Sequence, residues 1–435
     1  MNTQNKFELE RDTRLKYQFL RFKMGICNIF HKKWLWLALA LYIVFAIYAR
    51  HVIYYTVPEA SNIAAVANSI TLKITYPFFA VAGFIVLLVF LGTPLGAKKI
   101  NKSLNIIGLT NHVGQSPFLL RRYKEFGVTI MEFDPNGIPL SEWENKQQGI
   151  ETVLNMHVVK LEYGMSKGRI VLHTISGNEH LPKTIYWKDK YLSAEEFVLI
   201  LGQSMIGQEK TNLAKIPHVL LGGSTGSGKS VLLKLLIMQC VKKDAEVFIA
   251  DFKGGVDFLP VWHERCNIIT EENTLLEVLT DLVNELEDRK QVFREYGCAN
   301  INEYSKMNAP KIKRIVFACD EVAEVLDKTG LSKDAKELVN QIEGKLSIIA
   351  RQGRAFGIHL ILATQRPDAN ILTGQIRNNI DFRICGRADN VLSQIIMDNT
   401  NAADKIPKDS QGMFITHDGV IFKGYLFDEK AVFAH

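Results

Sequence analysis

The chain has 435 residues, and its 47% hydrophobic and 23% charged residues are typical of a folded protein with two or three domains, which excludes an intrinsically disordered chain. The net charge of +6, from 52 basic and 46 acidic residues, is too small to predict a nucleic-acid-binding surface by itself. The six cysteines form no C-x-x-C pair, so we expect reduced thiols in a cytosolic compartment rather than disulfides or a zinc site.

Two apolar stretches near the amino terminus predict a transmembrane hairpin, with helices at about residues 34–56 and 74–95. The second stretch contains 24 consecutive uncharged residues, more than the roughly 20 that a helix needs to cross a bilayer. The first contains sixteen and reaches the required length if the Arg50 side chain snorkels. The alternatives are a buried core hairpin and a signal peptide, although a signal peptide would not normally follow a charged tail at residues 1–33.

The distribution of basic residues predicts the orientation of this hairpin. The tail at residues 1–33 contains eight Lys and Arg residues, and three lysines follow the second stretch within residues 98–102. The loop between the stretches has few. The positive-inside rule then places both termini, and everything after the hairpin, on the cytoplasmic side of the plasma membrane.

Residues 98–200 have the pattern of a small α/β module. Alternating apolar residues predict strands at 128–133, 158–163 and 169–174, and a helix is predicted at 141–154. This segment offers no catalytic constellation. We expect it to be a structural spacer or an oligomerisation module.

The most specific motif of the chain is G-x-x-x-x-G-K-[ST], which begins at Gly223 and ends at Ser230. It follows a short apolar strand at 218–221 and precedes an apolar helix at 231–241, which is the context of a phosphate-binding loop. The predicted ATP-binding residues are Gly223, Ser224, Thr225, Gly226, Ser227, Gly228, Lys229 and Ser230. Lys229 would reach the β- and γ-phosphates, and the Ser230 hydroxyl would ligate Mg²⁺. An accidental Gly/Ser turn is the alternative, with a chance probability of about one per cent in a chain of this length.

The segment 201–435 that contains this loop repeats the order strand, loop, helix. Continuous apolar runs predict an α/β fold with a mainly parallel sheet that is covered on both faces. The predicted core strands are 247–250, 315–319, 359–363 and 382–385. A long amphipathic helix is predicted at 274–296, ending at Gly297.

Two carboxylates, Asp320 and Glu321, directly follow the predicted strand at 315–319. At the tip of a buried strand downstream of a phosphate loop, they are candidates for a Walker B pair. Asp320 would hold Mg²⁺, through water or together with Ser230, and Glu321 would polarise the attacking water. Asp320 as the N-cap of a following helix is the alternative, but it does not account for Glu321.

Gln365 follows the predicted strand at 359–363 and is a candidate to hydrogen-bond the γ-phosphate or the attacking water. A polar turn before Pro367 is the alternative. Arginines are dense in the same region, and any one of them could stabilise transition-state charge in a neighbouring subunit. They are Arg351, Arg354, Arg377, Arg383 and Arg387. Arg354 is retained as the catalytic candidate.

The residues around these motifs resemble the FtsK/SpoIIIE family of DNA-pumping ATPases. The segment Leu213–Ser230 is similar to that family's lead-in to its phosphate loop, and Arg354–Pro367, continued by Ile371–Ile380, is similar to its most distinctive motif. The resemblance covers roughly residues 120–425. It implies a RecA-like motor, a hexameric ring with ATP between subunits, and DNA bound without sequence preference in the central channel.

Two departures from the family pattern modify this expectation. The sequence Asp251-Phe-Lys253 stands where the family has Asp-Pro-Lys, so Asp251 and Lys253 are kept as nucleotide- or interface-linked candidates. The chain ends at His435, so we expect the winged-helix domain of the chromosome translocases, which reads DNA polarity, to be absent.

The two predicted spans and the short length look more like the FtsK-like coupling proteins of Gram-positive conjugative elements. The expected function is therefore a membrane-anchored, ATP-driven DNA translocase that delivers DNA to a transfer channel, with a relaxase or channel proteins as partners. The alternatives are a chromosome- or phage-type DNA translocase, a protein-secretion ATPase, and a nucleotide-gated scaffold that does not hydrolyse ATP.

Overall fold

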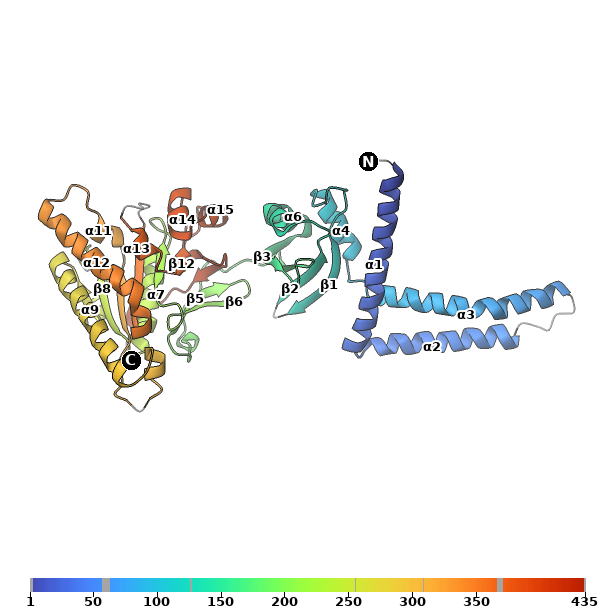
Figure 1. The fold of residues 1–435 in the computed structure, drawn as a ribbon, viewed down its shortest axis with the longest axis horizontal. Helices are drawn as coiled ribbons and strands as arrows, with labels where there is room; N and C mark the ends of the chain where they lie inside the picture. Colours follow the sequence, from blue (N-terminus) through green and yellow to red (C-terminus); the bar gives the residue numbers. More distant parts are fainter. Residues whose placement is uncertain are drawn as a thin grey trace. The chain divides into compact units, whose positions relative to one another are not determined.

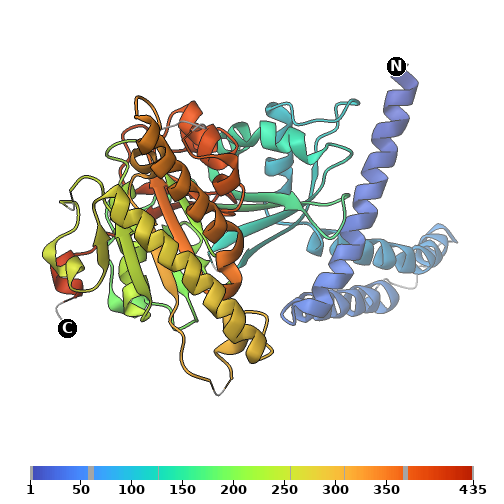
Figure 2. The same ribbon diagram turned by 60° about the vertical axis from the view of Figure 1, so that its left-hand side comes forward.

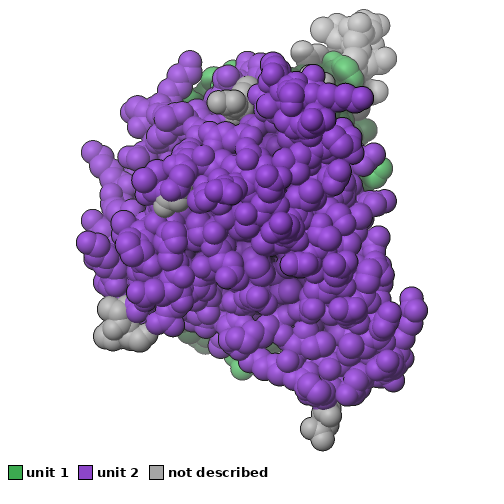
Figure 3. Space-filling view, turned by 90° about the vertical axis from the view of Figure 1, so that its left-hand side faces the viewer, with its two compact units in different colours: residues 1–179 green, residues 180–435 purple. Residues whose placement is uncertain are grey.

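The computed structural model describes residues 3–56, 63–125, 127–254, 256–307, 309–365 and 371–433. They divide into two compact units, residues 1–179 and 180–435, which Figure 3 colours separately. The second unit begins earlier than the expected boundary at residue 200. The segment before β5 (Val198–Ser204) belongs to this unit, because the Trp187 N–H donates to the carbonyl oxygen of Leu426 at 2.8 Å and Trp187 and Phe197 are part of the unit's core.

The first unit begins with long helices. They are α1 (Thr3–His31), α2 (Leu35–His51) with a π-helical extension η1 (Val52–Thr56), and α3 (Ile63–Leu91). Two stretches, Leu35–Tyr54 and Ile70–Leu91, are long and apolar enough to cross a membrane by length and composition. The second ends at Leu91 rather than at the expected residue 95, because Pro94 disfavours helical geometry in the residue before it.

Tyrosine hydroxyls join the two helices of this hairpin. Each hydroxyl donates to a main-chain carbonyl oxygen of the other segment: Tyr42 to Ala80 at 2.5 Å, Tyr76 to Ala46 at 2.5 Å, and Tyr54 to Lys73 at 3.1 Å. Gly83 makes room for one of them, since a Cβ atom there would lie 2.7 Å from the Tyr42 hydroxyl oxygen. The hairpin is therefore held by polar bonds along its length as well as by apolar contact.

Helix α1 crosses the end of α3 at very short range. A Cβ atom on Gly25 would lie 2.0 Å from the carbonyl oxygen of Leu88, and one on Gly92 would lie 1.9 Å from that of Arg21. The Asn28 side-chain amide also donates to the carbonyl oxygen of Leu91 at 3.0 Å. Figures 1 and 2 show α1 running across the ends of α2 and α3 rather than alongside them.

The rest of the first unit is a four-stranded antiparallel sheet in the order β1-β2-β4-β3, with three helices. Its elements are β1 (Phe118–Glu125), β2 (Val128–Asp134), β3 (Met156–Tyr163), β4 (Ile170–Ser176), α4 (Ala97–Ile106), α5 (Leu140–Asn145) and α6 (Gln147–Leu154). The single helix expected at 141–154 is two helices that meet at Lys146. The Lys146 ammonium donates to the carbonyl oxygens of Ile107 and Gly108, which ties this break to the end of α4.

The second unit is built on a ten-stranded sheet in the order β6-β5-β14-β13-β12-β7-β11-β10-β8-β9. Besides β5, the strands are β6 (Gly207–Asn212), β7 (Val219–Gly222), β8 (Glu246–Ala250), β9 (Asn267–Ile269), β10 (Ile315–Cys319), β11 (Ile358–Thr364), β12 (Phe382–Cys385), β13 (Met413–Thr416) and β14 (Ile421–Gly424). The strands from β12 to β9 are parallel, and the others are antiparallel. The predicted α/β fold with a mainly parallel sheet is confirmed.

Helices cover both faces of this sheet. Alternate residues of β10 face opposite ways: Val316 and Ala318 belong to the core that contains α7 (Lys229–Lys242), whereas Ile315 and Phe317 belong to the core under α9 (Glu272–Glu295) and α12 (Lys333–Phe356). Figures 1 and 2 show α9 and α12 side by side. The shorter helices are η2 (Asp189–Tyr191), α8 (Pro260–His263), α10 (Ile301–Tyr304), α11 (Val322–Leu326), α13 (Gly374–Arg377), α14 (Asn390–Met397), α15 (Asn401–Lys405) and α16 (Glu429–Val432).

Candidate nucleotide-binding site

The candidate site lies where three neighbouring parallel strands end. Strand β11 lies between β7 and β10 in the sheet, so the carboxyl ends of these strands meet at one edge. The loop Gly223–Ser230 follows β7, Asp320 and Glu321 follow β10, and Gln365 follows β11. The sheet topology thus brings together most of the residues that the sequence predicts. This edge is the usual ligand-binding position of an open α/β sheet.

The backbone of the loop requires glycine at two positions. Gly226 has φ +75° and Gly228 has φ +96°, the left-handed region that other residues rarely adopt. A Cβ atom on Gly228 would also lie 3.1 Å from the Cα atom of Gly412. Helix α7 begins directly after this turn, at Lys229. The loop and the first unpaired N–H groups of the helix therefore form a cradle of the kind that binds phosphate.

Segments from distant parts of the chain hold this loop in place. The Gly412 N–H donates to the carbonyl oxygen of Ser227 at 2.7 Å. The Arg387 guanidinium donates to the Ser224 hydroxyl at 3.2 Å and to the Thr225 carbonyl oxygen at 2.5 Å. Arg387 is one of the five arginines that the sequence makes candidates for action on a neighbouring subunit. In the structure it supports the phosphate loop of its own chain.

Lys229 and Ser230 both bind Asp320. The Lys229 ammonium donates to the main-chain carbonyl oxygen of Asp320 and, at 3.0 Å, to its carboxylate. The Ser230 hydroxyl donates to the same carboxylate, 2.9 Å from Oδ1. Asp320 does not cap a helix, because the residue at the N-cap of α11 is Glu321 and its side chain makes no capping bond. The hydroxyl and the carboxylate form a pair of hard oxygen donors of the kind that Mg²⁺ prefers.

A second lysine shares Asp320. The Lys253 ammonium lies 3.1 Å from Oδ2 of Asp320 and 3.1 Å from Oδ2 of Asp257. Burial raises the pKa of Asp320, but the two lysines lower it by more, so the net pKa is below the ordinary value. Partial burial lowers the pKa of Lys253, and the two carboxylates raise it above its ordinary value. Asp320 and Lys253 therefore both remain charged at neutral pH.

Glu321 is restrained by the strand beside it. The buried Thr364 hydroxyl donates to Oε1 of Glu321 at 2.8 Å, and the Gln365 N–H donates to Oε2 at 3.0 Å. The Gln365 side chain turns to the phosphate loop, where its amide oxygen accepts a hydrogen bond from the Thr225 hydroxyl at 2.9 Å. Gln365 thus connects the predicted Walker B glutamate to the loop. Sequence reasoning missed Thr364, although a polar residue at the end of an apolar strand was a signal for it.

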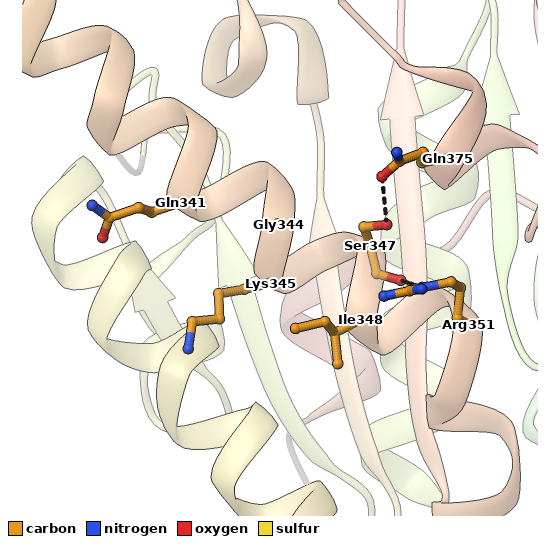
Figure 4. Close-up of a pocket in the computed structure, with 7 residues that line it drawn as sticks. All are labelled: Gln341, Gly344, Lys345, Ser347, Ile348, Arg351 and Gln375. Carbon is orange, nitrogen blue, oxygen red and sulfur yellow. Dashed lines mark hydrogen bonds between the residues drawn. The ribbon is translucent and has the colours of Figure 1, made fainter.

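Arg354 is not near the phosphate loop of its own chain. It is exposed on the last turn of α12, which leads into the amino end of β11, whereas the loop lies at the carboxyl ends of the strands. Arg351, one turn earlier, lines an open pocket of about 330 Å³, where Ser347 lies 3.4 Å from the Gln375 amide oxygen (Figure 4). The motif residues from Arg366 to Asn370 lie outside the described part of the chain, so the motif's Pro367 has no structural account.

One hydroxyl of the phosphate loop has an unused hydrogen-bonding capacity. Among the described residues, the buried Oγ atom of Ser227 has no hydrogen-bond partner. Buried polar groups are almost always paired, and an unpaired one calls for an explanation. This atom is packed against Gly223, where an added Cβ atom would lie 2.5 Å from it, so it does not face the cradle. The groups that phosphate oxygens would meet are the N–H groups of the cradle, the Lys229 ammonium and the Ser230 hydroxyl. The residues present therefore fit a nucleoside triphosphate.

Comparison with known proteins gives consistent results. Residues 185–343 match the model of the FtsK/SpoIIIE family. A solved structure of the pCW3 conjugation coupling protein TcpA, a monomer form with ATPgS, is 35% identical, covers 77% of this chain and 96% of that chain, and has a TM-score of 0.58.

Two curated relatives are named DNA translocase FtsK. The protein of Chlamydia trachomatis serovar D is 35% identical over 227 residues, which are 47% of this chain and 27% of the relative. The protein of Clostridium acetobutylicum is 28% identical over 332 residues, which are 71% of this chain and 41% of the relative. The chain therefore spans between about a quarter and two fifths of the length of these relatives.

Proposed function

The chain belongs to the FtsK/SpoIIIE family, and from this we propose that it is a membrane-anchored, ATP-driven DNA translocase that acts as a coupling protein in conjugative DNA transfer. The observation that carries this proposal is the 35% identity to a conjugation coupling protein over 77% of this chain and 96% of that protein. The site described above supplies the machinery for hydrolysis. The coupling protein is matched over 96% of its own length, whereas the two translocases are matched over 27% and 41% of theirs.

In this proposal, ATP binding changes the partners of Lys229. Its ammonium now lies against Asp320, and a triphosphate in the cradle offers it phosphate oxygens instead. Ser230 and Asp320 would hold Mg²⁺, which neutralises charge on the phosphate oxygens when it is bound. Glu321 polarises the attacking water. Thr364 and Gln365 each donate to its carboxylate and hold it in place, and the remaining lone pairs of the two oxygens are left to accept a bond from water.

The exposed surface of the hairpin supports a membrane location. Large apolar side chains of α2 and α3 are exposed along both helices, among them Leu37, Leu41, Phe45, Phe78, Phe79 and Phe90. Exposed apolar area of this extent is unfavourable in water, at roughly 25 cal/mol per Å², and is favourable in a bilayer. The basic tail before the hairpin supports a cytoplasmic position of the motor. ATP is available in that compartment.

The DNA-binding part of the proposal is a homohexameric ring whose channel contacts the DNA backbone without reading its sequence. Backbone contacts need positive charge only along the channel. The modest net charge of +6 is therefore compatible with this function. A relaxase or a transfer-channel protein would be the natural partner of such a ring at the membrane.

The test is ATP hydrolysis and DNA movement by the full-length protein in lipid nanodiscs. We expect double-stranded or single-stranded DNA to stimulate hydrolysis, and the active form of DNA to be moved in a strand-displacement assay. Lys229→Ala should abolish both activities. If neither DNA form stimulates hydrolysis while a secreted protein substrate does, the chain is a secretion ATPase instead.

A mating assay separates conjugation from chromosome handling. Deletion of the gene should lower the frequency of transfer of its element, and the Lys229→Ala variant should fail to restore transfer. If transfer is normal while chromosome segregation fails, the proposal of a coupling protein is wrong, and the chain is a chromosome-type translocase.

A further inference from the structure

One side of α1 carries an apolar stripe whose two ends have different surroundings. The stripe consists of Leu15, Phe19, Phe22, Ile26 and Ile29, and its spacings of four, three, four and three keep these side chains on one face of the helix. The last three pack with the hairpin in a small hydrophobic cluster. The first two are each 56% exposed. The hairpin therefore covers only one end of the stripe, and Leu15 and Phe19 at the other end are left uncovered by it.

The other side of α1 rests on the sheet of the same unit. The Tyr17 ring stacks on Phe118 with ring centroids 3.7 Å apart, and Lys16 forms an ion pair with Asp134 at 3.2 Å. Leu15 and Phe19 each lie two residues from Tyr17, which is a rotation of about 200° around a helix. These two side chains therefore face away from the sheet. They face the side of α1 from which the hairpin projects.

Aromatic side chains mark the level at which the hairpin begins. Phe30 and Trp34 are each 71% exposed and Trp36 is 51% exposed, at the end of α1 and the start of α2. Exposed Trp residues at the end of a membrane span are typical of the membrane–water interface. Because α1 runs across the ends of α2 and α3 (Figures 1 and 2), a hairpin that crosses a bilayer places α1 in the plane of this interface. This step rests on the proposed membrane location of the hairpin.

The charge of this region matches an anionic surface. Residues 1–33 contain eight Lys and Arg residues against three Asp and Glu residues. Arg11 and Lys23 are exposed and flank the apolar stripe, and the Lys23 ammonium lies 4.7 Å from the centroid of the Phe19 ring. A helix with apolar residues on one face and basic residues at the edges of that face is typical of an interfacial helix. Anionic phospholipids of the cytoplasmic leaflet attract such basic residues.

The apolar stripe, the exposed aromatic residues where the hairpin begins and the flanking basic residues support one arrangement. We infer that α1 lies flat in the headgroup region of the cytoplasmic leaflet. Leu15 and Phe19 enter the boundary between headgroups and acyl chains, and Arg11 and Lys23 bind the phosphate groups of anionic phospholipids. Helix α3 thus covers one end of the apolar stripe, and the bilayer covers the other end. The module and the motor that follow would then be attached to the membrane at a surface as well as through the hairpin.

Nitroxide labels in the full-length protein test this inference. The exposed Cys27 and the partly exposed Cys298 are first changed to Ser, and one label is placed at Phe19→Cys, at Phe79→Cys on α3, or at the exposed Tyr123→Cys on β1. Accessibility to oxygen and to an aqueous nickel chelate is measured in nanodiscs of phosphatidylcholine with 0 or about 30% phosphatidylglycerol. We expect the label at Phe79 to be in the acyl region, that at Tyr123 in water, and that at Phe19 between them.

The outcomes separate this inference from the proposed membrane location. If the label at Phe79 is in the bilayer but that at Phe19 is as accessible to nickel as that at Tyr123, the in-plane helix is refuted and the anchor remains. If the label at Phe79 is itself in water, the membrane location is refuted, and the in-plane helix fails with it. If the label at Phe19 is shielded equally without nanodiscs, a protein surface or a second copy covers the stripe, which also contradicts the inference.

A charge-reversal variant tests the role of anionic lipid. Each basic residue near an anionic surface contributes an attraction equivalent to roughly a fivefold change in binding. Lys23→Glu should therefore raise the nickel accessibility of the Phe19 label several-fold in discs with phosphatidylglycerol and leave it unchanged in pure phosphatidylcholine. Lys124→Glu, an exposed lysine on β1, is the matched control and should have no effect. Equal effects of the two variants would contradict a specific contact of Lys23 with lipid.

Discussion

Asp320 accepts hydrogen bonds from Lys229, Ser230 and Lys253. The two lysines contact different oxygens of its carboxylate. A Mg²⁺ ion at Asp320 would approach a carboxylate that two ammonium groups and one hydroxyl already contact, so its binding would compete electrostatically with both lysines. Binding of a metal–nucleotide complex is thus coupled to the positions of Lys229 and Lys253.

Replacement of the buried Glu321 by Gln should stop hydrolysis and preserve nucleotide binding. The amide keeps the size of the side chain but cannot accept a proton from water, so the turnover rate should fall by about 10²-fold or more. The dissociation constant of a fluorescent ATP analogue should change little, in contrast to Lys229→Ala. The exposed Glu324→Gln is the matched control and should retain full turnover. A Glu321→Gln variant that still hydrolyses ATP at the normal rate would remove this residue from the reaction.

Residues within one motif were predictable from the sequence, and residues brought in by the sheet were not. The spacing of the loop motif identifies Lys229 and Ser230. The position directly after one apolar strand identifies Asp320 and Glu321. The contact between Arg387 and Ser224 joins positions that are 163 residues apart. It exists only because β12 lies beside β7. No local sequence pattern shows that these two strands are neighbours. The support that Arg387 gives to the phosphate loop of its own chain could therefore not be predicted.

At the scale of the elements, the amino ends of β7 and β11 enclose two buried histidines. His218 accepts a hydrogen bond from the Leu360 N–H at 2.9 Å, and His359 lies 2.9 Å from the carbonyl oxygen of Pro217. Burial lowers the pKa of His218 to about 4, and burial together with Arg314 lowers the pKa of His359 well below its ordinary value. Both imidazoles are therefore neutral in the folded unit at neutral pH.

These histidines predict an acid-sensitive stability of the second unit. Between about pH 6.5 and pH 4 the unfolded chain binds protons that the folded chain does not, so stability falls as the pH falls, by about 1.4 kcal/mol per pH unit for each histidine. His218→Asn keeps an acceptor for the Leu360 N–H and should make the fall of Tm with pH less steep. Thermal unfolding monitored by tryptophan fluorescence measures this slope. The exposed His263→Asn is the control, and an equal change in both variants would contradict the assignment.

The crossing of α1 and α3 predicts opposite effects of the same substitution in two helices. Ala is intrinsically better than Gly in a helix by about 1 kcal/mol, so Gly149→Ala in α6, where the new Cβ meets Ile107 at 3.6 Å, should be neutral or stabilising. In Gly25→Ala the new Cβ would lie 2.0 Å from a main-chain oxygen, so α1 must move away from α3. Trypsin should then cleave α1 faster in nanodiscs. Equal cleavage rates in both variants would show that the close crossing does not hold α1.

All the parallel strands except the three-residue β9 were predicted from the sequence, and several antiparallel ones were not. Strands β8, β10, β11 and β12 are continuous apolar runs, because both faces are covered by helices. In contrast, β1 has an exposed, charged half and gives no such signal. The hydrophobic pattern of α1 was also missed, since its apolar stripe is interrupted by many basic residues.

At the scale of the whole molecule, the position of Arg354 predicts action between subunits. It lies at the opposite edge of the sheet from its own phosphate loop and cannot act there, so in the proposed ring any action on a nucleotide would be on a neighbour's. Arg354→Ala should reduce hydrolysis by the assembled protein by roughly 10³-fold or more and leave ATP binding intact. Arg351→Ala, one turn earlier on α12, is the matched control.

A mixing experiment checks this directly. Assemblies of Lys229→Ala alone or Arg354→Ala alone should be inactive. In a random equimolar mixture, roughly a quarter of the interfaces combine an intact loop with an intact arginine, so activity should reappear. Mixtures that stay inactive, or Arg354→Ala assemblies that hydrolyse ATP normally, would contradict a role in trans.

The bonds between tyrosine hydroxyls and main-chain carbonyls in the hairpin have a mechanical consequence. A motor that pulls on DNA exerts an equal and opposite force on its anchor. Sliding α2 against α3 by one helical turn, about 5.4 Å, would break the bonds of Tyr42, Tyr54 and Tyr76 together, and the proposed bilayer offers no water to replace them. The two helices should therefore resist this force as a single rigid unit rather than as two independent anchors.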